Sequence, residues 1–163
     1  MDIQMIDSLQ FQMIDPIRRI ITHDYPRTFG TIAFGDLQPV GISWRSEGVE
    51  PIVVRSMDQG MVWIGVDQQL VAMDLNDDRV AIALPLSSNV VQIMVLPLVT
   101  VVLTELEVLI FNVDRSLRCV KGLPEIGTHL LQQGTTLMIQ LLDGNSLILN
   151  PETGVLKERM LVA

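Results

Sequence analysis

The stretch QLVAMDLNDDRVAIAL, residues Gln69–Leu84, decides the fold. An apolar run is followed by a polar turn and a second apolar run, which is the pattern of two antiparallel strands joined by a short loop. At a shift of 38 residues, and without a gap, it lies over EVLIFNVDRSLRCVKG (Glu107–Gly122) and NSLILNPETGVLKERM (Asn145–Met160). A period of about 40 residues indicates a repeat architecture in which each unit is one supersecondary element.

The repeated unit extends upstream and contains four short strands. Asp74, Asn112 and Asn150 coincide at the end of the third strand, where such side chains can accept hydrogen bonds from the backbone two residues on. The second strands are Val62–Val66, Val101–Thr104 and Ile139–Leu142, and the first strands are Ile52–Val54, Val90–Val95 and Thr128–Gln132. One more shift backwards brings Thr31–Trp44 into the same frame, with Asp36 under Asp74.

Several of these strands are apolar on both faces. VLIF (Val108–Phe111) and LVAM (Leu70–Met73) have no polar side to turn to water, so their sheets must be covered on both sides. Four-stranded antiparallel sheets packed around an axis meet this condition. Units such as VWIGVDQQLVAMDLNDDRVAIAL resemble the blades of quinoprotein-like and Trp-Asp-repeat β-propellers, closely over Gly60–Met160 and loosely over Ile17–Gln59. The WD dipeptide and the tryptophans of quinoprotein blades are missing, so the resemblance implies a fold and no cofactor.

The predicted fold class is therefore all-β, with antiparallel four-stranded repeats in a single domain over residues 1–163. Residues 17–163 are expected to form about four blade-like repeats, and residues 1–16 an N-terminal edge strand or a short capping helix. The repeats would build a small four-bladed propeller or a half-propeller completed by another chain. A β-sandwich or a curled sheet made from the same hairpins is the alternative.

Composition narrows the classes of protein. Apolar residues make up 48 % and charged residues 18 %, yet no window approaches eighteen uninterrupted apolar residues, so no membrane segment is expected. The formal charge of -8 disfavours direct contact with nucleic acid. No Lys or Arg occurs in the first ten residues, which disfavours a targeting presequence. Cys119 is the single cysteine, so no internal disulfide can form and a cytoplasmic location is expected.

Few residues are suited to catalysis. His23 and His129 are the only histidines, and neither has a Cys pair or a nucleophile elbow nearby. His23 belongs to HDYPR, where it stands with Asp24, Tyr25 and Arg27 in a possible ligand loop. No catalytic, metal-binding or cofactor-binding residue is predicted, and the chain is not expected to be an enzyme.

Acidic residues concentrate in the segments that a blade arrangement brings to one face, namely the connections between units and the turns between second and third strands. None of these segments contains Lys or Arg. A rigid surface of one sign suits rapid capture of a basic protein. The predicted partner-binding residues are Glu47, Glu50, Asp67, Glu105, Glu107, Glu125 and Asp143.

Three functions follow from these patterns. The first is a non-catalytic protein-binding domain, an acidic inhibitor or immunity-type protein that neutralises a basic partner such as a nuclease toxin; this rests on charge and size. The second is a scaffold subunit that forms a homodimer or a larger assembly through apolar strand edges. The third is a small-ligand binder or enzyme that uses an axial pocket and the HDYPR loop.

Overall fold

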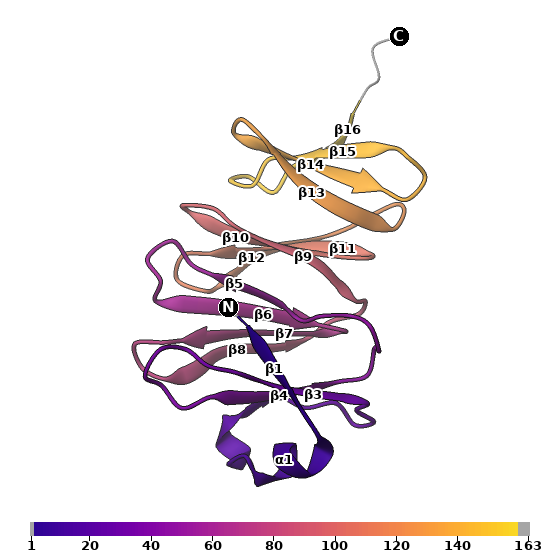
Figure 1. Ribbon diagram of the computed structural model, residues 1–163. Coiled ribbons are helices and arrows are strands. Elements are labelled where there is room, and N and C mark those ends of the chain that lie inside the picture. The colour runs from indigo at the N-terminus through magenta and orange to yellow at the C-terminus, as the bar shows by residue number, and fades with distance from the viewer. Residues whose placement is uncertain (1, 160–163) are drawn as a thin grey trace. The chain divides into compact units, whose positions relative to one another are not determined.

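The computed structural model describes residues 2–159 and confirms the all-β fold class (Figure 1). The chain divides into two compact units, Met1–Pro85 (unit 1) and Leu86–Ala163 (unit 2), and each unit contains two four-stranded sheets. The prediction of a single domain over the whole chain stays a prediction. Among the described residues, no helix is long and apolar enough to cross a membrane.

Three of the four sheets are antiparallel meanders in which the strands follow the order of the chain. The second sheet of unit 1 contains β5 (Ile52–Arg55), β6 (Met61–Val66), β7 (Gln69–Asp74) and β8 (Arg79–Pro85). The first sheet of unit 2 contains β9 (Val90–Val95), β10 (Val99–Thr104), β11 (Glu107–Asn112) and β12 (Leu117–Gly122). Its second sheet contains β13 (Gly127–Gln133), β14 (Thr136–Leu141), β15 (Ser146–Leu149) and β16 (Leu156–Glu158).

The repeat is visible in details of these sheets. The pairing register of β7 with β8 shifts between Ala72 and Met73, and that of β11 with β12 shifts between Ile110 and Phe111. These two shifts fall at the same position of the repeat. Shifts of this kind are typical of β-bulges, which bend an edge strand and increase its twist. The recurrence of an irregularity at the predicted spacing supports a shared architecture for these two sheets.

The strand-end Asp and Asn residues make the expected turn contacts in two repeats. Oδ1 of Asp74 accepts the backbone N–H groups of Asn76 and Asp77, at 3.0 and 3.2 Å. Asn150 does the same for the two residues after Pro151. In the third repeat Asn112 instead bonds the side chains of its neighbours, and the turn is held by the next acid, Asp114. The side chain at this position of the repeat therefore has the predicted turn contacts in two of the three repeats.

Each unit has its own apolar core between its two sheets. In unit 1, Ile32 and Ile42 of the first sheet pack with Ile64 and Met73 of the second. In unit 2, the core joins Val101, Val108 and Ile110 to residues such as Ile139 and Leu149. Burial of such side chains from both sheets is the main stabilising contribution within each unit.

The first sheet of unit 1 departs from the repeat. It has the order β1-β3-β4-β2 and contains β1 (Ile3–Ile6), β2 (Arg19–Ile21), β3 (Thr28–Ile32) and β4 (Val40–Trp44). The 38-residue frame places Val40–Trp44 in an outer strand, but β4 is a central strand with all five residues buried. Outside it lies β2, which runs parallel to it. The prediction of four antiparallel copies is therefore wrong for this sheet, because its outer strand comes from the preceding segment of the chain.

The N-terminal segment supplies both an edge strand and a helix, the two alternatives expected for it. β1 pairs with β3, and α1 (Ser8–Met13) follows, with Asp7 in a capping box with Gln10. Phe11 on α1 packs on Phe29 of β3, with ring centroids 5.3 Å apart. A Cβ atom at Gly41 would lie 3.1 Å from the Phe11 ring, so this glycine lets α1 approach the sheet. The helix thus covers the face of the first sheet that is turned away from the core.

The last sheet shows a register difference of one residue. Val101 pairs with Ile110, whereas Ile139, its counterpart in the repeat, pairs with Leu147 and not with Ile148. The turn between β14 and β15 is longer than its counterpart and contains Gly144 at φ +88°. The pairing of β14 with β15 therefore departs by one residue from the gap-free alignment of the repeats, because the longer turn shifts the register.

Candidate functional site

The acidic residues predicted in unit 2 come together along one edge. The connection that contains Glu125 is hydrogen-bonded to the turns of both sheets: Gly127 donates to the carbonyl of Glu105, and Leu142 donates to the carbonyl of Ile126, each at 2.8 Å. Asp143 follows Leu142 directly in the second of these turns. Three acids from separate segments are thus held on the same edge of unit 2.

Their carboxylates are held by neutral donors. Glu125 Oε1 accepts the N–H of Ile126 at 2.8 Å, and Asp143 accepts the backbone and side-chain N–H groups of Asn145 at 3.0 and 2.9 Å. Glu105 Oε1 lies 3.4 Å from the amide nitrogen of Asn89. Neutral donors orient a carboxylate and leave its negative charge in place. This edge therefore remains acidic even though its members have structural contacts.

Glu107 is the fourth predicted acid of unit 2 and begins β11. Its backbone N–H donates to the hydroxyl of Thr104 at 3.0 Å, and that hydroxyl donates to its carbonyl at 3.1 Å. Thr104 is fully buried and also accepts from Ser88. The turn that carries Glu105 and Glu107 is thus fixed by a buried hydroxyl pair.

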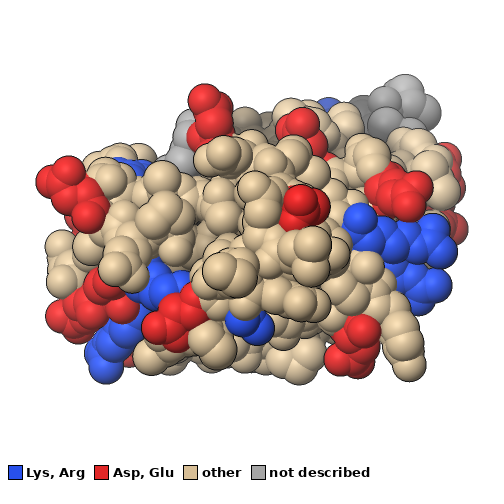
Figure 2. All heavy atoms as spheres, turned by 60° about the horizontal axis from the view of Figure 1, so that its bottom comes forward, with Lys and Arg blue, Asp and Glu red and all other residues tan. Residues whose placement is uncertain are grey.

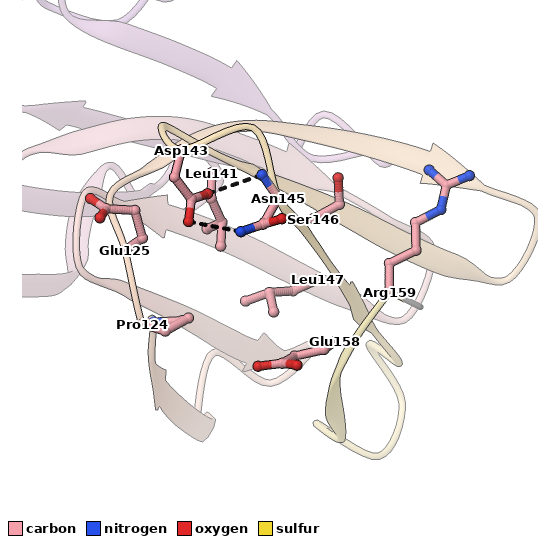
Figure 3. Close-up of a pocket in the computed structure, with 9 residues that line it drawn as sticks. All are labelled: Pro124, Glu125, Leu141, Asp143, Asn145, Ser146, Leu147, Glu158 and Arg159. Atoms are coloured by element: carbon pink, nitrogen blue, oxygen red, sulfur yellow. Dashed lines mark hydrogen bonds between the residues drawn. The ribbon is translucent and has the colours of Figure 1, made fainter. Parts of the chain in front are cut away.

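A pocket of about 280 Å³ lies along this edge, shown in Figure 3. Glu125 and Asp143 line it together with Glu158 of β16, and Leu147 lies between them. Arg159 also lines the pocket, but its guanidinium points away from the carboxylates in Figure 3 and contacts Met138 Sδ at 3.1 Å. Sequence reasoning missed Glu158 because its place depends on the pairing of β16 with β15.

In unit 1, Asp67 has a structural role. It sits at φ +49° in the turn between β6 and β7, and its Oδ2 accepts the N–H groups of Arg45 and Ser46 at 2.8 and 3.3 Å. Partial burial acts to raise the pKa of Asp67, but the hydrogen bonds from Ser46 and Arg45, together with nearby His23, outweigh it and hold the pKa below its ordinary value. The carboxylate of Asp67 therefore links the β6–β7 turn of the second sheet to the residues that follow β4 of the first sheet.

The other two predicted acids of unit 1 differ from one another. Glu47 forms an exposed ion pair with Arg27 of the HDYPR loop, at 3.6 Å. Glu50 is exposed, and within residues 2–159 its carboxylate has no hydrogen bond or ion pair. The loops of unit 1 thus bring both signs of charge together. The face in Figure 2 likewise shows acidic and basic side chains interspersed among uncharged ones.

The HDYPR loop is a hydrogen-bonded turn. Nδ1 of His23 accepts the N–H of Tyr25 at 3.0 Å, and the N–H of His23 donates to Ser43 at 3.1 Å. The N–H of Arg27 donates to the carbonyl of Trp44. Tyr25 is 76 % exposed, and Asp24 is exposed as well. The imidazole therefore stabilises the loop internally, and the backbone N–H groups of His23 and Arg27 hold the loop against β4.

The remaining reactive side chains stand apart. His129 is exposed on β13. Cys119 is half-buried, and a Cβ atom at Gly154 would lie 2.7 Å from its sulfur, so the thiol packs closely against that turn. Within residues 2–159 no group of three or more His, Cys, Asp or Glu side chains is arranged to hold a metal ion.

Comparison with known proteins agrees on the fold. No protein-family model matches the chain, and the search of curated proteins gives no match. Solved structures do match. The Neurospora crassa Pan2 WD40 domain is 10 % identical with a TM-score of 0.54, over 68 % of this chain and 37 % of that chain. The Myceliophteria thermophila Cps50 (Swd1) β-propeller domain is 14 % identical with a TM-score of 0.56, over 71 % and 40 %.

A third match is dihydro-heme d1 dehydrogenase NirN in complex with DHE, 13 % identical with a TM-score of 0.58, over 83 % of this chain and 33 % of that chain. Identities this low show the fold alone. They confirm the resemblance to β-propeller blades, and the four sheets are of this type. The chain spans between a third and two fifths of the length of these three chains.

Proposed function

We propose that the chain is a non-catalytic protein-binding module that docks a basic partner through the acidic edge of unit 2. The acidic edge comprises Glu105, Glu107, Glu125, Asp143 and Glu158. The observation that carries the proposal is the pocket bordered by Glu125, Asp143 and Glu158, with the guanidinium of Arg159 directed away from it.

Electrostatics supports this role. Carboxylates from three separate segments are held on a β-sheet frame, so they do not have to be gathered when a partner arrives. The formal charge of -8 adds long-range attraction for a cationic protein. Attraction of this kind raises the association rate and is weakened by salt.

In its finer form, the proposal is an inhibitor or immunity-type protein whose acidic edge covers the basic substrate groove of a nuclease toxin. A nuclease groove must attract phosphates and is therefore rich in Lys and Arg. An acidic edge on a rigid frame is complementary to such a groove.

The test compares two variants that lose the same number of charges. Glu125→Gln, Asp143→Asn and Glu158→Gln together neutralise the pocket and keep the hydrogen-bonding groups. Asp36→Asn, Asp114→Asn and Glu152→Gln form the matched control, because these three acids are exposed and do not line the pocket. Each protein is tagged and used to capture partners from a lysate at low salt and at ~0.5 M salt, where the Debye length is about 4 Å.

We expect the unchanged protein and the control to retain the same basic protein, and the pocket variant to lose it. The association rate of the purified pair should fall at least about tenfold in the pocket variant, with a weaker salt dependence. Equal retention by the two variants would contradict the proposal. Inhibition of nuclease activity of the captured partner would establish the finer form.

A scaffold function is the second candidate, favoured by one observation. Leu9, Met13 and Ile17 in the N-terminal segment are 71 %, 87 % and 80 % exposed. Large apolar side chains this exposed are typical of assembly surfaces when they are adjacent. Leu9→Gln with Met13→Gln would then change the molar mass measured by light scattering, whereas the pocket variant would not.

A further inference from the structure

A second pocket, of about 420 Å³, lies in unit 1 beside two edge strands. Residues of β1 and β5 line it, and within residues 2–159 β1 pairs only with β3 and β5 only with β6. Its volume is within the range of sites that hold small ligands or single side chains, roughly 300–1,000 Å³. None of its lining residues belongs to the acidic edge of unit 2.

Part of the pocket lining is apolar and held in place. Ile3, Met5, Val53 and Pro51 line the pocket together with Trp44. The indole N–H donates to the carbonyl of Val49 at 3.0 Å, which fixes the ring.

A glycine, Gly30, allows Ile3 to take its place in the pocket lining. A Cβ atom at Gly30 would lie 2.7 Å from Cγ2 of Ile3 and 3.5 Å from Cη2 of Trp44. The missing side chain therefore lets Ile3 approach β3, and this part of the lining exists before any ligand arrives.

Both charged residues that line the pocket are acidic. Asp2 and Glu50 line it, both residues are exposed, and no Lys or Arg is among the lining residues. Within residues 2–159, neither carboxylate has a hydrogen bond or an ion pair. Glu47, three residues before Glu50, is instead paired with Arg27.

We propose that this pocket binds the side chain of a lysine from a protein partner. The methylene stem would lie along Met5 and Val53, and the ammonium would reach the carboxylates of Asp2 and Glu50. An ammonium on a flexible apolar stem fits a site with an apolar wall and two carboxylates from separate segments. This inference goes beyond the proposed function, because it concerns a separate site in unit 1.

The test uses the two tryptophans of the chain as internal reporters. Trp44 lines the pocket and Trp63 does not. The full chain labelled with ¹⁵N is titrated with Nα-acetyl-lysine amide, and the two indole N–H signals are followed by NMR. We expect a saturable shift of the Trp44 signal and a stationary Trp63 signal. The uncharged analogue Nα-acetyl-norleucine amide should leave both signals in place.

Two variants make the result specific. Glu50→Gln should weaken binding of the lysine probe by about threefold to fivefold, the effect of losing one exposed charge pair. Glu47→Gln, in the same loop but outside the pocket, should leave the affinity unchanged. The proposal is overturned by equal movement of both indole signals, by an unchanged affinity in Glu50→Gln, or by tighter binding of Nα-acetyl-arginine amide.

Failure of this site and failure of the proposed function give different results. If the acidic edge does not dock a partner, lysate capture fails while the Trp44 signal still responds to the lysine probe. If the lysine pocket is wrong, the Trp44 signal does not respond while the three-charge pocket variant of unit 2 still loses its partner.

Discussion

The two sheets of unit 1 obtain their outer strands in different ways. In the second sheet, β8 follows β7 along the chain, pairs antiparallel with it and is largely exposed. In the first sheet, β2 precedes β4 and lies parallel to it, while α1 packs on the same sheet. The neighbouring strand is consequently buried in all of its residues, Val40–Trp44.

This difference shows that a helix can cover the second face of a sheet whose first face packs on the core of its unit. The Phe11–Phe29 contact and the close approach at Gly41 supply part of that cover. The N-terminal segment therefore acts as a capping element for the first sheet.

The largest predicted effect tests the burial of β4. Ile42 is fully buried, whereas Val80, its counterpart in the 38-residue frame, is 38 % exposed. Ile42→Ala should lower the free energy of unfolding by about 2–5 kcal/mol, because it leaves a cavity in the core. Val80→Ala should cost about 0.5 kcal/mol, as expected for an exposed edge. Urea unfolding followed by circular dichroism measures both, and equal small losses would place β4 at an edge.

A smaller effect is expected where α1 meets the first sheet. At Gly41, an added Cβ would lie 2.8 Å from Cδ1 of Ile14 and 3.1 Å from the Phe11 ring. Gly41→Ala should therefore cost about 1–3 kcal/mol through overpacking. Gly122→Ala on β12 is the matched control, since nothing lies within 4 Å of its Cβ position, and it should change stability by less than about 0.5 kcal/mol. If both variants unfold at the same urea concentration, α1 does not cover the sheet.

The strand-end turns give the next comparison. Asp74→Ala removes the acceptor of two backbone N–H groups and should cost about 1 kcal/mol. The frame places Asp36 of the first sheet under Asp74, but Asp36 is exposed, so Asp36→Ala should be neutral within about 0.5 kcal/mol. Thermal unfolding of both variants at neutral pH distinguishes them. If Asp36→Ala lowers the stability as much as Asp74→Ala, then Asp36 has the same turn role as Asp74 and the first sheet follows the repeat at this position.

The smallest effect concerns the link between the two sheets. Because the folded-state pKa of Asp67 is lowered, its stabilising contribution is present above about pH 4 and is lost as the pH falls through the folded-state pKa. Asp67 is only partly buried and solvent screens its interactions, so the loss should stay below about 1 kcal/mol. Asp67→Asn should remove this part of the acid dependence. The check is urea unfolding of both proteins between pH 5 and pH 2, and identical slopes would show that Asp67 does not contribute.

Much of the fold could be predicted from the sequence because it depends on local pattern. The strand, turn and strand around Gln69–Leu84 follow from apolar runs and turn residues close together in the chain. The turn contacts of Asp74 and Asn150 are equally local, since donor and acceptor are two or three residues apart. The sequence allows an edge strand or a helix at the N-terminus, and the structure contains both, β1 and α1.

The candidate sites were less predictable because they depend on contacts between distant segments. The sequence indicated that Glu125 and Asp143 would share a face, but Glu158 entered their pocket only through the pairing of β16. The sequence predicts Asp67 as a partner-binding acid, and in the structure its carboxylate accepts the N–H groups of Arg45 and Ser46. A charge in a sequence does not show which backbone donors will surround it.

The sequence by itself determined the 38-residue period, the four-stranded unit and the placement of turns, because strand patterns and turn residues act over a few neighbouring positions. Only the tertiary structure decided that β2 would pair in parallel with β4, and that Trp44, Asp2 and Glu50 would line one pocket. These arrangements depend on which surfaces remain to be buried once the local elements have formed. In the first sheet, packing of the N-terminal segment, and not its place in the repeat, fixes the topology.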